Sequence, residues 1–593
     1  MPLNFNIKKY LLWILVFLLF AFFTQKIIKN FDGPVFGYGD TNNWEHTGYF
    51  LYKYLSFTPL PQIQFINDGT LFPFGSNHVF QSWSFEKDFF WMSFYHFFGN
   101  GPWLKFYTLF TFIITFFGSY FILKKFFNDT QSIITSILLT FFNFYSILKY
   151  PYHLVFSNTH WLILSILLDF LLIRNYVILK KIHFHLVLLR ALTLSLGLGQ
   201  ELGYVVGLNL TSFLITYFFL FIYLFLDNKI SLLLELKKKI LENRIFSIFT
   251  ISIFFIVFVF YFSLILEVRK NIYSFPSKEI PEGVWWSNPL RIFLPFFPNI
   301  IRSNDFLESF FKDTPDGLGT GSVGFTLLCL GILGLYHTKN KIKIFLPLLV
   351  MLFLFFLYHP KFFPILKIFP WFQYMRVSGR ATLVLPAIFA IFTLGIDWTK
   401  FKSIQFQILV IIFTIISLIE LNHAYKLRIS IDSKIPKEFY AYMEIIKNSK
   451  GEGVLDWPFC IYGANLDTGL CPFYPQTIGS YSFTKFHEKK VIGQYYGRVH
   501  PSQVAPFNKL GLKELFLYDK NSNPLFPSQS RCFNENEWKK FEEFYYKYDF
   551  SGINLYTDTI GEKCKLEFYK KFGNPIARVK IPYSGNLEFI PKK

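Results

Sequence analysis

One carboxylate, Asp40, stands in a polar and aromatic segment directly after the first hydrophobic stretch of the chain. Gly37 and Gly39 permit tight backbone turns before it, and an aromatic amphipathic stretch, 44–56, follows. Such a stretch can lie in a membrane interface, which would hold Asp40 at headgroup depth. A carboxylate there could take the proton of an acceptor during group transfer. The alternative interpretation is a helix N-cap, where Asp is also favoured.

Other residues that could contact a substrate stand near the ends of hydrophobic stretches. Glu45 follows Asp40 closely and is a weaker candidate. His153 and His160 are seven residues apart and could share a helix face as substrate or metal contacts, although a lone His is more often structural. Glu201 lies near the expected outer end of a span, where an ionisable residue is costly and suggests function. Its alternative role is a helix–helix hydrogen bond.

Two arginines, Arg376 and Arg380, precede a late hydrophobic stretch on the side of the membrane that otherwise has few basic residues. Arginine recognises phosphate through its planar fork, so the pair is predicted to bind a lipid phosphate or diphosphate. The alternative is snorkelling of both side chains into the headgroup layer. Arg291 is a third outer cation with less support.

The composition predicts a polytopic membrane protein. The 593 residues are 52% hydrophobic and 17% charged, as expected for a chain of membrane spans. The net charge of +20 fits basic residues in cytoplasmic loops, and no basic soluble domain indicates nucleic-acid binding. About eleven stretches suit a bilayer core of about 20 residues per helix. They are 9–28, 103–123, 131–149, 156–173, 186–206, 208–226, 245–266, 321–336, 343–358, 381–396 and 405–421.

Basic residues occur in alternate connections between these stretches, while the connection 150–158 has no Lys or Arg. The positive-inside rule therefore predicts a cytoplasmic N-terminus in the inner membrane. The flank of the first stretch lacks a small-residue cleavage site, so that stretch is predicted to be retained as an anchor. An odd number of spans then places the C-terminal tail outside.

The predicted organisation is a transmembrane domain, 1–421, with outer loops at 29–102 and 267–320, and an extracytoplasmic α/β or α+β domain, 422–593. The tail contains four of the five cysteines. An even number outside the cytoplasm suits disulfides, for which three pairings exist. The most local is our hypothesis, while metal binding lacks the usual C-x-x-C spacing. This most local pairing joins Cys460 to Cys471 and Cys532 to Cys564.

Together these parts resemble the GT-C superfamily of polytopic glycosyltransferases, in particular a group of large bacterial membrane proteins. The acidic Gly39-Asp40 segment matches the family's first outer loop, and the Arg380 segment precedes a span. Thr41 stands where some branches have a second acid, which weakens the case for a divalent metal, a possible cofactor. The remaining matching segments are Phe72-Pro73-Phe74-Gly75-Ser76-Asn77, Tyr474-Pro475-Gln476-Thr477, His487-Glu488-Lys489-Lys490-Val491-Ile492-Gly493 and Tyr496-Gly497-Arg498.

The resemblance implies an enzyme that moves a sugar from a polyprenyl-phosphate carrier to a surface glycan, lipid or protein of the cell envelope. Asp40 would be the general base or would orient the acceptor, Arg380 would bind the donor phosphate, and the tail would recognise the acceptor. Two alternatives remain open. One is a lipid or polysaccharide transporter, which usually shows inverted repeats and interrupted helices. The other is a non-catalytic scaffold built on a degenerate transferase fold. The chain has no P-loop, HExxH or GxSxG sequence.

Overall fold

The structure is a computed structural model. Arg376, Arg291 and the second predicted outer loop from residue 273 onward lie outside the residues that it describes. The described ranges are 3–28, 31, 33–37, 39–272, 323–338, 342–359, 361–372, 377–398, 403–427, 433–463, 469–471, 476–519 and 528–593.

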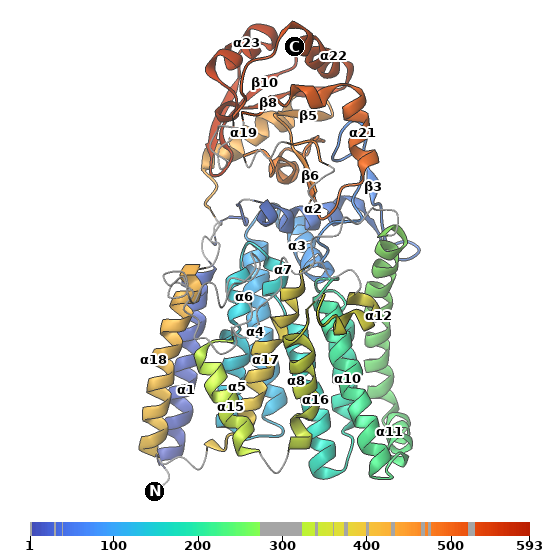
Figure 1. Cartoon of the computed structure of the whole chain (residues 1–593), viewed down its shortest axis with the longest axis vertical. Coiled ribbons are helices and arrows are strands. Elements are labelled where there is room, and N and C mark those ends of the chain that lie inside the picture. Colours follow the sequence, from blue (N-terminus) through green and yellow to red (C-terminus); the bar gives the residue numbers. More distant parts are fainter. Residues whose placement is uncertain are drawn as a thin grey trace.

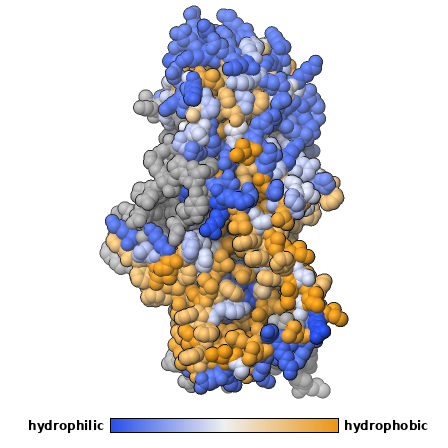
Figure 2. Space-filling model, turned by 90° about the vertical axis from the view of Figure 1, so that its right-hand side faces the viewer, coloured by the Kyte–Doolittle hydropathy of each residue, from blue (hydrophilic) through white to orange (hydrophobic). Residues whose placement is uncertain are grey.

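Long helices form a bundle beneath a separate layer of helices and strands (Figure 1). Apolar side chains cover much of the bundle surface, whereas hydrophilic ones cover much of the tail (Figure 2). Helices are the expected form, because a backbone in lipid must satisfy its own hydrogen bonds. Five helical stretches are long and apolar enough to cross a membrane. They comprise α4 (Trp103–Leu123), α5 (Asp129–Phe141) with α6 (Phe144–Lys149), α7 (Leu154–Ser157) with α8 (His160–Leu179), α10 (Val205–Leu226) and α12 (Arg244–Ile272).

Six shorter apolar helices complete the bundle within the described ranges. Each of the eleven predicted stretches coincides with one of these apolar helices, long or short. The fold class is therefore confirmed as a mainly helical bundle with a mixed-sheet tail, while the number of membrane crossings stays a prediction. The shorter helices comprise parts of α1 (Leu3–Phe22) with η1 (Phe23–Ile27), α9 (Phe184–Gly197), α15 (Phe325–His337), α16 (Ile342–Phe356), α17 (Leu385–Phe392) with the 3-10 turns on either side, and α18 (Ser403–Leu427).

A buried ion pair connects three helices inside the bundle. Arg190 on α9 donates from Nε to Asp169 Oδ1 on α8 at 2.7 Å and from Nη2 to Asp169 Oδ2 at 3.1 Å. Ser212 on α10 donates to the same carboxylate at 2.6 Å. All three side chains are buried. Sequence reasoning missed this pair, although two ionisable residues inside predicted spans were a sufficient signal.

The tail is an α/β unit built on a mixed four-stranded sheet in the order β5-β8-β10-β9. Strands β5 (Gly453–Trp457) and β8 (Phe550–Tyr556) pair in parallel and are buried at every position, as expected for strands covered on both faces. Antiparallel pairing adds β10 (Gly585–Pro591) and β9 (Ala577–Ile581). The surrounding helices are α19 (Lys437–Asn448), α21 (Pro501–Lys509), α22 (Glu535–Lys547) and α23 (Glu562–Phe572).

The four tail cysteines lie in two pairs, Cys460 with Cys471 and Cys532 with Cys564, the pairing predicted from the sequence. Their Cα atoms are 4.8 and 5.0 Å apart, within the usual range for a disulfide. Each pair closes a local loop around the sheet. The fifth cysteine, Cys329 on α15, is not part of a disulfide.

The first outer loop and the tail share a hydrophobic core. Leu71 and Phe72 lie in the same buried cluster as the sheet residues of the tail. The backbone N–H of Phe72 donates to Val491 O at 3.1 Å, and that of Val491 donates to Gly69 O at 3.1 Å. Two segments singled out in the sequence, 72–77 and 487–493, thus meet directly. The segment of the loop around residues 69–72 is therefore part of the folded core of the tail.

Helix α2 (Asn43–Tyr54) lies across the top of the bundle, below the tail (Figure 1). The prediction that this aromatic stretch lies in the headgroup layer is wrong for Trp44, Tyr49 and Phe50. Trp44, Tyr49 and Phe50 are buried, and only Tyr52 is exposed. The physical reason is that the tail and α3 (Phe85–Phe98) cover α2, and their apolar side chains replace lipid as its neighbours.

A buried carboxyl in the sheet predicts a pH dependence of stability. Burial raises the pKa of Asp456 from 3.8 to about 7, against a hydrogen bond from Asn554. The folded protein therefore holds this proton more tightly than the unfolded chain, so stability falls as pH rises towards 7. We expect the free energy of unfolding of the full chain to drop by about 2 kcal/mol between pH 5.5 and 7.5. Denaturant titrations at both values measure this drop, and Asp456→Asn should remove it. An equal drop in that variant would contradict the assignment.

Candidate active site

Asp40 lies where three distant segments meet. It belongs to the 3-10 turn η2 (Gly39–Asn42), and its Oδ2 is 3.0 Å from Nε2 of His153, which precedes α7. Tyr495, on strand β7 (Gln494–Tyr496) of the tail, hydrogen-bonds the same carboxyl. The N-cap of α2 is Asn42, so the interpretation of Asp40 as the cap of that helix is not supported. The carboxyl side chain remains 20% exposed.

The surroundings keep Asp40 ionised. Burial alone would raise the pKa of its carboxyl. The hydrogen bond and charge of His153 outweigh burial, with smaller contributions from Tyr495 and Arg380, so the pKa lies below the ordinary aspartate value. The low pKa favours a fixed anion that orients neighbouring groups over a strong proton acceptor.

Tyr495 remains a hydrogen-bond donor at this site. Burial and the nearby Asp40 charge raise the pKa of its hydroxyl well above the usual value, so the phenol stays protonated. Its ring stacks on Tyr462 of β6 (Ile461–Gly463), with ring centres 5.4 Å apart. These two residues are partners in the parallel β6–β7 pair. The small sheet thus sets the position of the tyrosine over the carboxylate.

Arg380 is held beside this pair by aromatic rings. It lies in the 3-10 turn η8 (Ser378–Val384), with its guanidinium carbon 4.2 Å from the ring centre of Phe156 and 5.0 Å from that of Tyr204. Phe156 is on α7, three residues after His153, so one short segment positions both the imidazole and the guanidinium. An arginine side chain recognises planar acceptors such as phosphate through its guanidinium fork.

The loop carrying His153 is itself fixed to α2. Trp44 Nε1 donates to the carbonyl of Tyr152 at 2.9 Å. Tyr481, in the tail, donates from its hydroxyl to Asn43 Oδ1 at 2.6 Å. The start of α2 is therefore bonded both to the bundle and to the tail, which limits the movement of Asp40.

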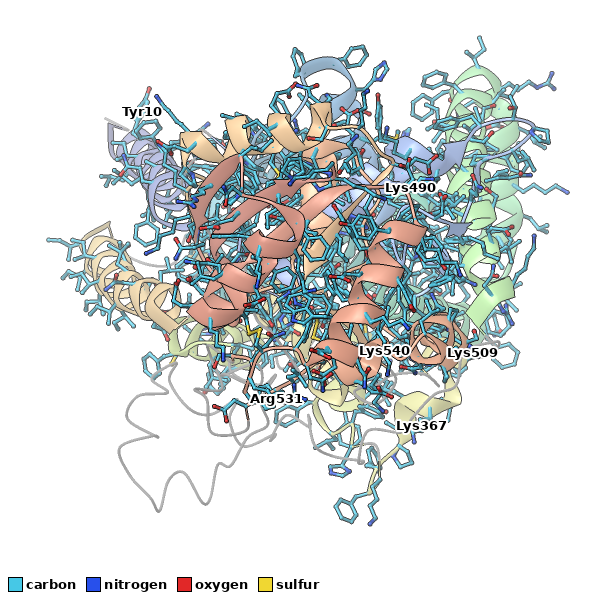
Figure 3. All side chains as sticks on the ribbon, turned by 90° about the horizontal axis from the view of Figure 1, so that it is seen from above. Tyr10, Lys367, Lys490, Lys509, Arg531 and Lys540 are labelled. Carbon is cyan, nitrogen blue, oxygen red and sulfur yellow. A yellow bond between two sulfur atoms is a disulfide. The ribbon has the colours of Figure 1, made fainter. Side chains whose placement is uncertain are left out.

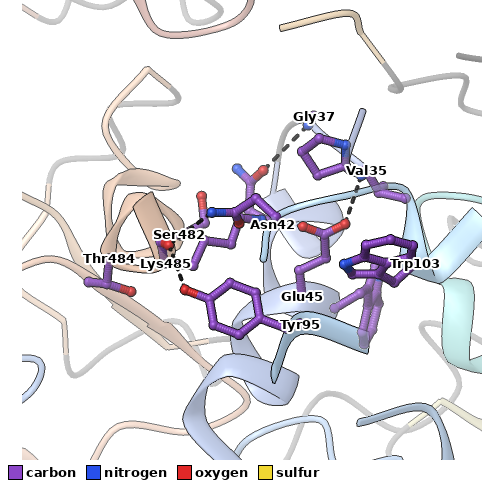
Figure 4. Close-up of polar contacts among 12 residues, drawn as sticks. Val35, Gly37, Asn42, Glu45, Tyr95, Trp103, Ser482, Thr484 and Lys485 are labelled. Atoms are coloured by element: carbon purple, nitrogen blue, oxygen red, sulfur yellow. Dashed lines mark hydrogen bonds and ion pairs between the residues drawn. The ribbon is translucent and has the colours of Figure 1, made fainter. Parts of the chain in front are cut away.

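Glu45 connects the first outer loop to the tail (Figure 4). Its Oε1 accepts the backbone N–H of Val35 at 2.8 Å, and its Oε2 forms a buried ion pair with Lys485. The carbonyl of Lys485 in turn accepts the hydroxyl of Tyr95 at 3.1 Å. Both oxygens of Glu45 are engaged within the protein, and the predicted substrate contact is replaced by a structural one.

We expect Glu45→Gln to loosen the junction without unfolding the chain. The variant keeps an acceptor but leaves Lys485 as a buried charge without a counterion, a cost of about 3 kcal/mol. Hydrogen exchange of the segment 477–490 measures the effect as faster opening. Glu452→Gln is the matched control, since this exposed partner of Lys490 should change exchange little. Equal exchange in both variants would contradict the role of Glu45.

The remaining predicted residues are placed apart from Asp40. His153 and His160 do not share a helix face, because α7 ends at Ser157 and α8 begins at His160. His160 Nε2 lies 3.0 Å from Glu86 Oε1. Glu201 accepts the backbone N–H groups of residues 203, 204 and 205 and thereby satisfies the start of α10. Neither His160 nor Glu201 is brought to the Asp40 carboxylate by a direct contact.

Within the described ranges, no three His, Cys, Asp or Glu side chains form a group that could hold a metal ion. Asp40 and His153 together offer two donors. The divalent metal considered from the sequence stays a prediction. Tyr495 was missed by sequence reasoning, although it directly precedes the segment Tyr496-Gly497-Arg498 that carried part of the family resemblance.

Neither a protein-family model nor a curated protein matches the chain. Among solved structures, the apo oligosaccharyltransferase of Archaeoglobus fulgidus aligns with 92% of this chain and 69% of its own, at 10% identity and a TM-score of 0.43. Apo ArnT from Cupriavidus metallidurans aligns with 97% of each chain at 9% identity and a TM-score of 0.40. ArnT from the same organism bound to undecaprenyl phosphate aligns with 97% of each chain at 10% identity and a TM-score of 0.39. These matches agree with the predicted resemblance but carry no argument about chemistry.

Proposed function

We propose that the chain is a membrane glycosyltransferase that moves one sugar from a polyprenyl-phosphate carrier to an acceptor at the outer face of the cytoplasmic membrane. The observation that carries the proposal is the Asp40–His153 pair beside the stacked guanidinium of Arg380. It combines an anion that can orient an acceptor with a cation suited to a phosphate. The proposal includes a cytoplasmic N-terminus and an extracytoplasmic tail.

In the proposed reaction the acceptor oxygen attacks the anomeric carbon of the sugar. A new C–O bond forms there while the bond from that carbon to the phosphate oxygen breaks, and its electron pair leaves with the polyprenyl phosphate. Arg380 stabilises the charge that develops on the phosphate. Asp40 orients the acceptor hydroxyl beside the His153 ring, and its carboxylate takes the acceptor proton as the new C–O bond forms and makes that proton acidic. Tyr495 completes the hydrogen bonding of Asp40 from the tail.

The acceptor class is open among a surface glycan, a lipid and a protein. The test compares these three fractions by mass spectrometry in a deletion strain and in the same strain with the wild-type chain restored. Loss of one sugar increment on deletion, and its return on restoration, is the expected result. Release of the sugar from a polyprenyl-phosphate donor by the purified chain then separates a transferase from a scaffold or transporter. Undecaprenyl phosphate, the lipid in one of the compared ArnT structures, is the carrier to use.

A further inference from the structure

A polar cavity lies between the first outer loop and the tail. Its volume is about 150 Å³, room for about five water molecules. One wall is the face of α2 that carries His46, Tyr49 and Phe50. The opposite wall comes from two segments that the proposed reaction does not use, residues 67–78 of the loop and 488–490 of the tail. Lys490 lies at this edge of the tail, joined to Asp68 of the loop (Figure 3).

His46 is the unusual residue of this cavity. Its side chain is 96% buried, and neither ring nitrogen has a hydrogen-bond partner. Burial and the charges of Lys485 and Lys87 lower the pKa of the imidazole to about 3, so the ring is neutral and offers one donor and one acceptor. Buried polar groups are normally satisfied, and an orphaned one facing a cavity indicates a missing partner.

Two of the three lysines that line the cavity are already matched. Lys489 Nζ donates to the carbonyls of Ser449 and Gly451 at 2.6 and 2.8 Å. Lys490 Nζ pairs with Asp68 and Glu452 at 2.6 and 2.8 Å. The third, Lys53, lies 5.7 Å from the ring centre of Tyr49, and the carboxylate of Glu488 lines the same cavity. This mixture of matched and opposite charges favours a neutral ligand over an anion. The aromatic rings of Tyr49, Phe50 and Tyr54 beside neutral polar groups are a combination suited to a sugar, which has apolar C–H faces and several hydroxyls.

The cavity wall includes the end of a short helix. Glu488, with a φ of 59°, caps α20 (Thr484–His487) in the left-handed conformation with which many helices end. His78, which also lines the cavity, already has hydrogen-bond partners: its Nε2 contacts Ser76 and Thr70 at 2.7 and 3.1 Å. The cavity therefore has one rigid imidazole and one unpartnered one.

We propose that this cavity binds one neutral saccharide unit of the acceptor, so that the acceptor is a glycan. The inference rests on the proposed function for the role of this ligand as acceptor, while binding itself can be measured without any transfer. His46 would exchange hydrogen bonds with sugar hydroxyls, and an aromatic ring of α2 would cover the C–H face of the ring.

The experiment is saturation-transfer NMR on the purified full chain in lipid nanodiscs. The probes are the methyl glycosides of glucose, galactose, mannose and N-acetylglucosamine, with inorganic phosphate as competitor. At least one glycoside should bind saturably in the wild type and in Asp40→Asn, without displacement by phosphate. His46→Leu should reduce that signal at least tenfold, with a melting temperature equal to or above that of the wild type, because it removes an orphaned polar group. His46→Gln should retain part of the binding, and Tyr52→Phe on the exposed side of α2 is the control.

Three results would overturn the inference: no glycoside binds, phosphate displaces the bound glycoside, or His46→Leu binds as the wild type does. Failure of the proposed function looks different. In that case the glycoside binds and His46→Leu abolishes binding, but the purified chain releases no sugar from the polyprenyl-phosphate donor. If transfer is active, His46→Leu should raise the KM for a glycan acceptor about tenfold and leave kcat within twofold.

Discussion

Asp40→Asn is expected to lower sugar transfer by about 10²–10⁴-fold, the usual contribution of a positioned acid–base group. Asparagine has the same size and retains an oxygen for the Tyr495 hydroxyl, but it loses the charge that pairs with His153. The measurement is release of sugar from the polyprenyl-phosphate donor by equal amounts of purified variant. In cells the variant should lack the same sugar increment as the deletion strain.

The matched control is Asp227→Asn, which neutralises a partly exposed carboxylate paired with Lys180, outside the junction that contains Asp40. This variant should transfer sugar at nearly the wild-type rate. Full activity of Asp40→Asn would make Asp40 a structural residue. The scaffold and transporter alternatives would then be favoured, provided that the deletion still alters the envelope.

Arg190→Leu is expected to be the most destabilising single change in the bundle. It leaves the Asp169 carboxylate buried among helices with only neutral partners such as Ser212. Breaking a buried ion pair from one side costs about 3–5 kcal/mol. The free energy of unfolding in detergent micelles measures this loss. A free energy of unfolding within about 0.5 kcal/mol of the wild-type value would show that the pair does not hold α8 and α9 together.

Removing both charges separates the pair from the packing around it. The double variant Asp169→Leu with Arg190→Leu should recover most of the lost stability, because no unpaired charge remains. Lys238→Gln on the exposed helix α11 (Ser231–Glu242) is the control, since its pairing with Glu242 is solvent-exposed. That change should lie within about 0.5 kcal/mol of the wild type.

The sequence predicted the apolar helices and the mixed-sheet class of the tail well, because both depend on long averages of residue type. Hydropathy over about 20 residues is insensitive to single side chains. The disulfide pairing also followed from proximity along the chain, as with Cys460 and Cys471. Asp40, His153 and Arg380 were each singled out on local grounds, and the structure brings them together.

The partners of those residues were not predictable in the same way. Glu45 and Lys485 meet only because the first loop folds against the tail, and no local pattern encodes a contact of that range. His153 and His160 appeared to share a face because a periodicity argument assumes one continuous helix, whereas the chain turns between them. The second outer loop lies outside the described residues, so that part of the predicted organisation stays a prediction.

The shared core of loop and tail has a consequence for biosynthesis. Leu71 and Phe72 are translated long before the tail strands that bury them, so during synthesis they face water or a chaperone. The Asp40 carboxylate likewise gains its hydrogen bond from Tyr495 only after the tail has been translated. Nascent chains paused before the tail should therefore be inactive towards the lipid-linked sugar even when every preceding helix has been inserted. Competence would arise in one late step, after the last membrane helix has left the ribosome.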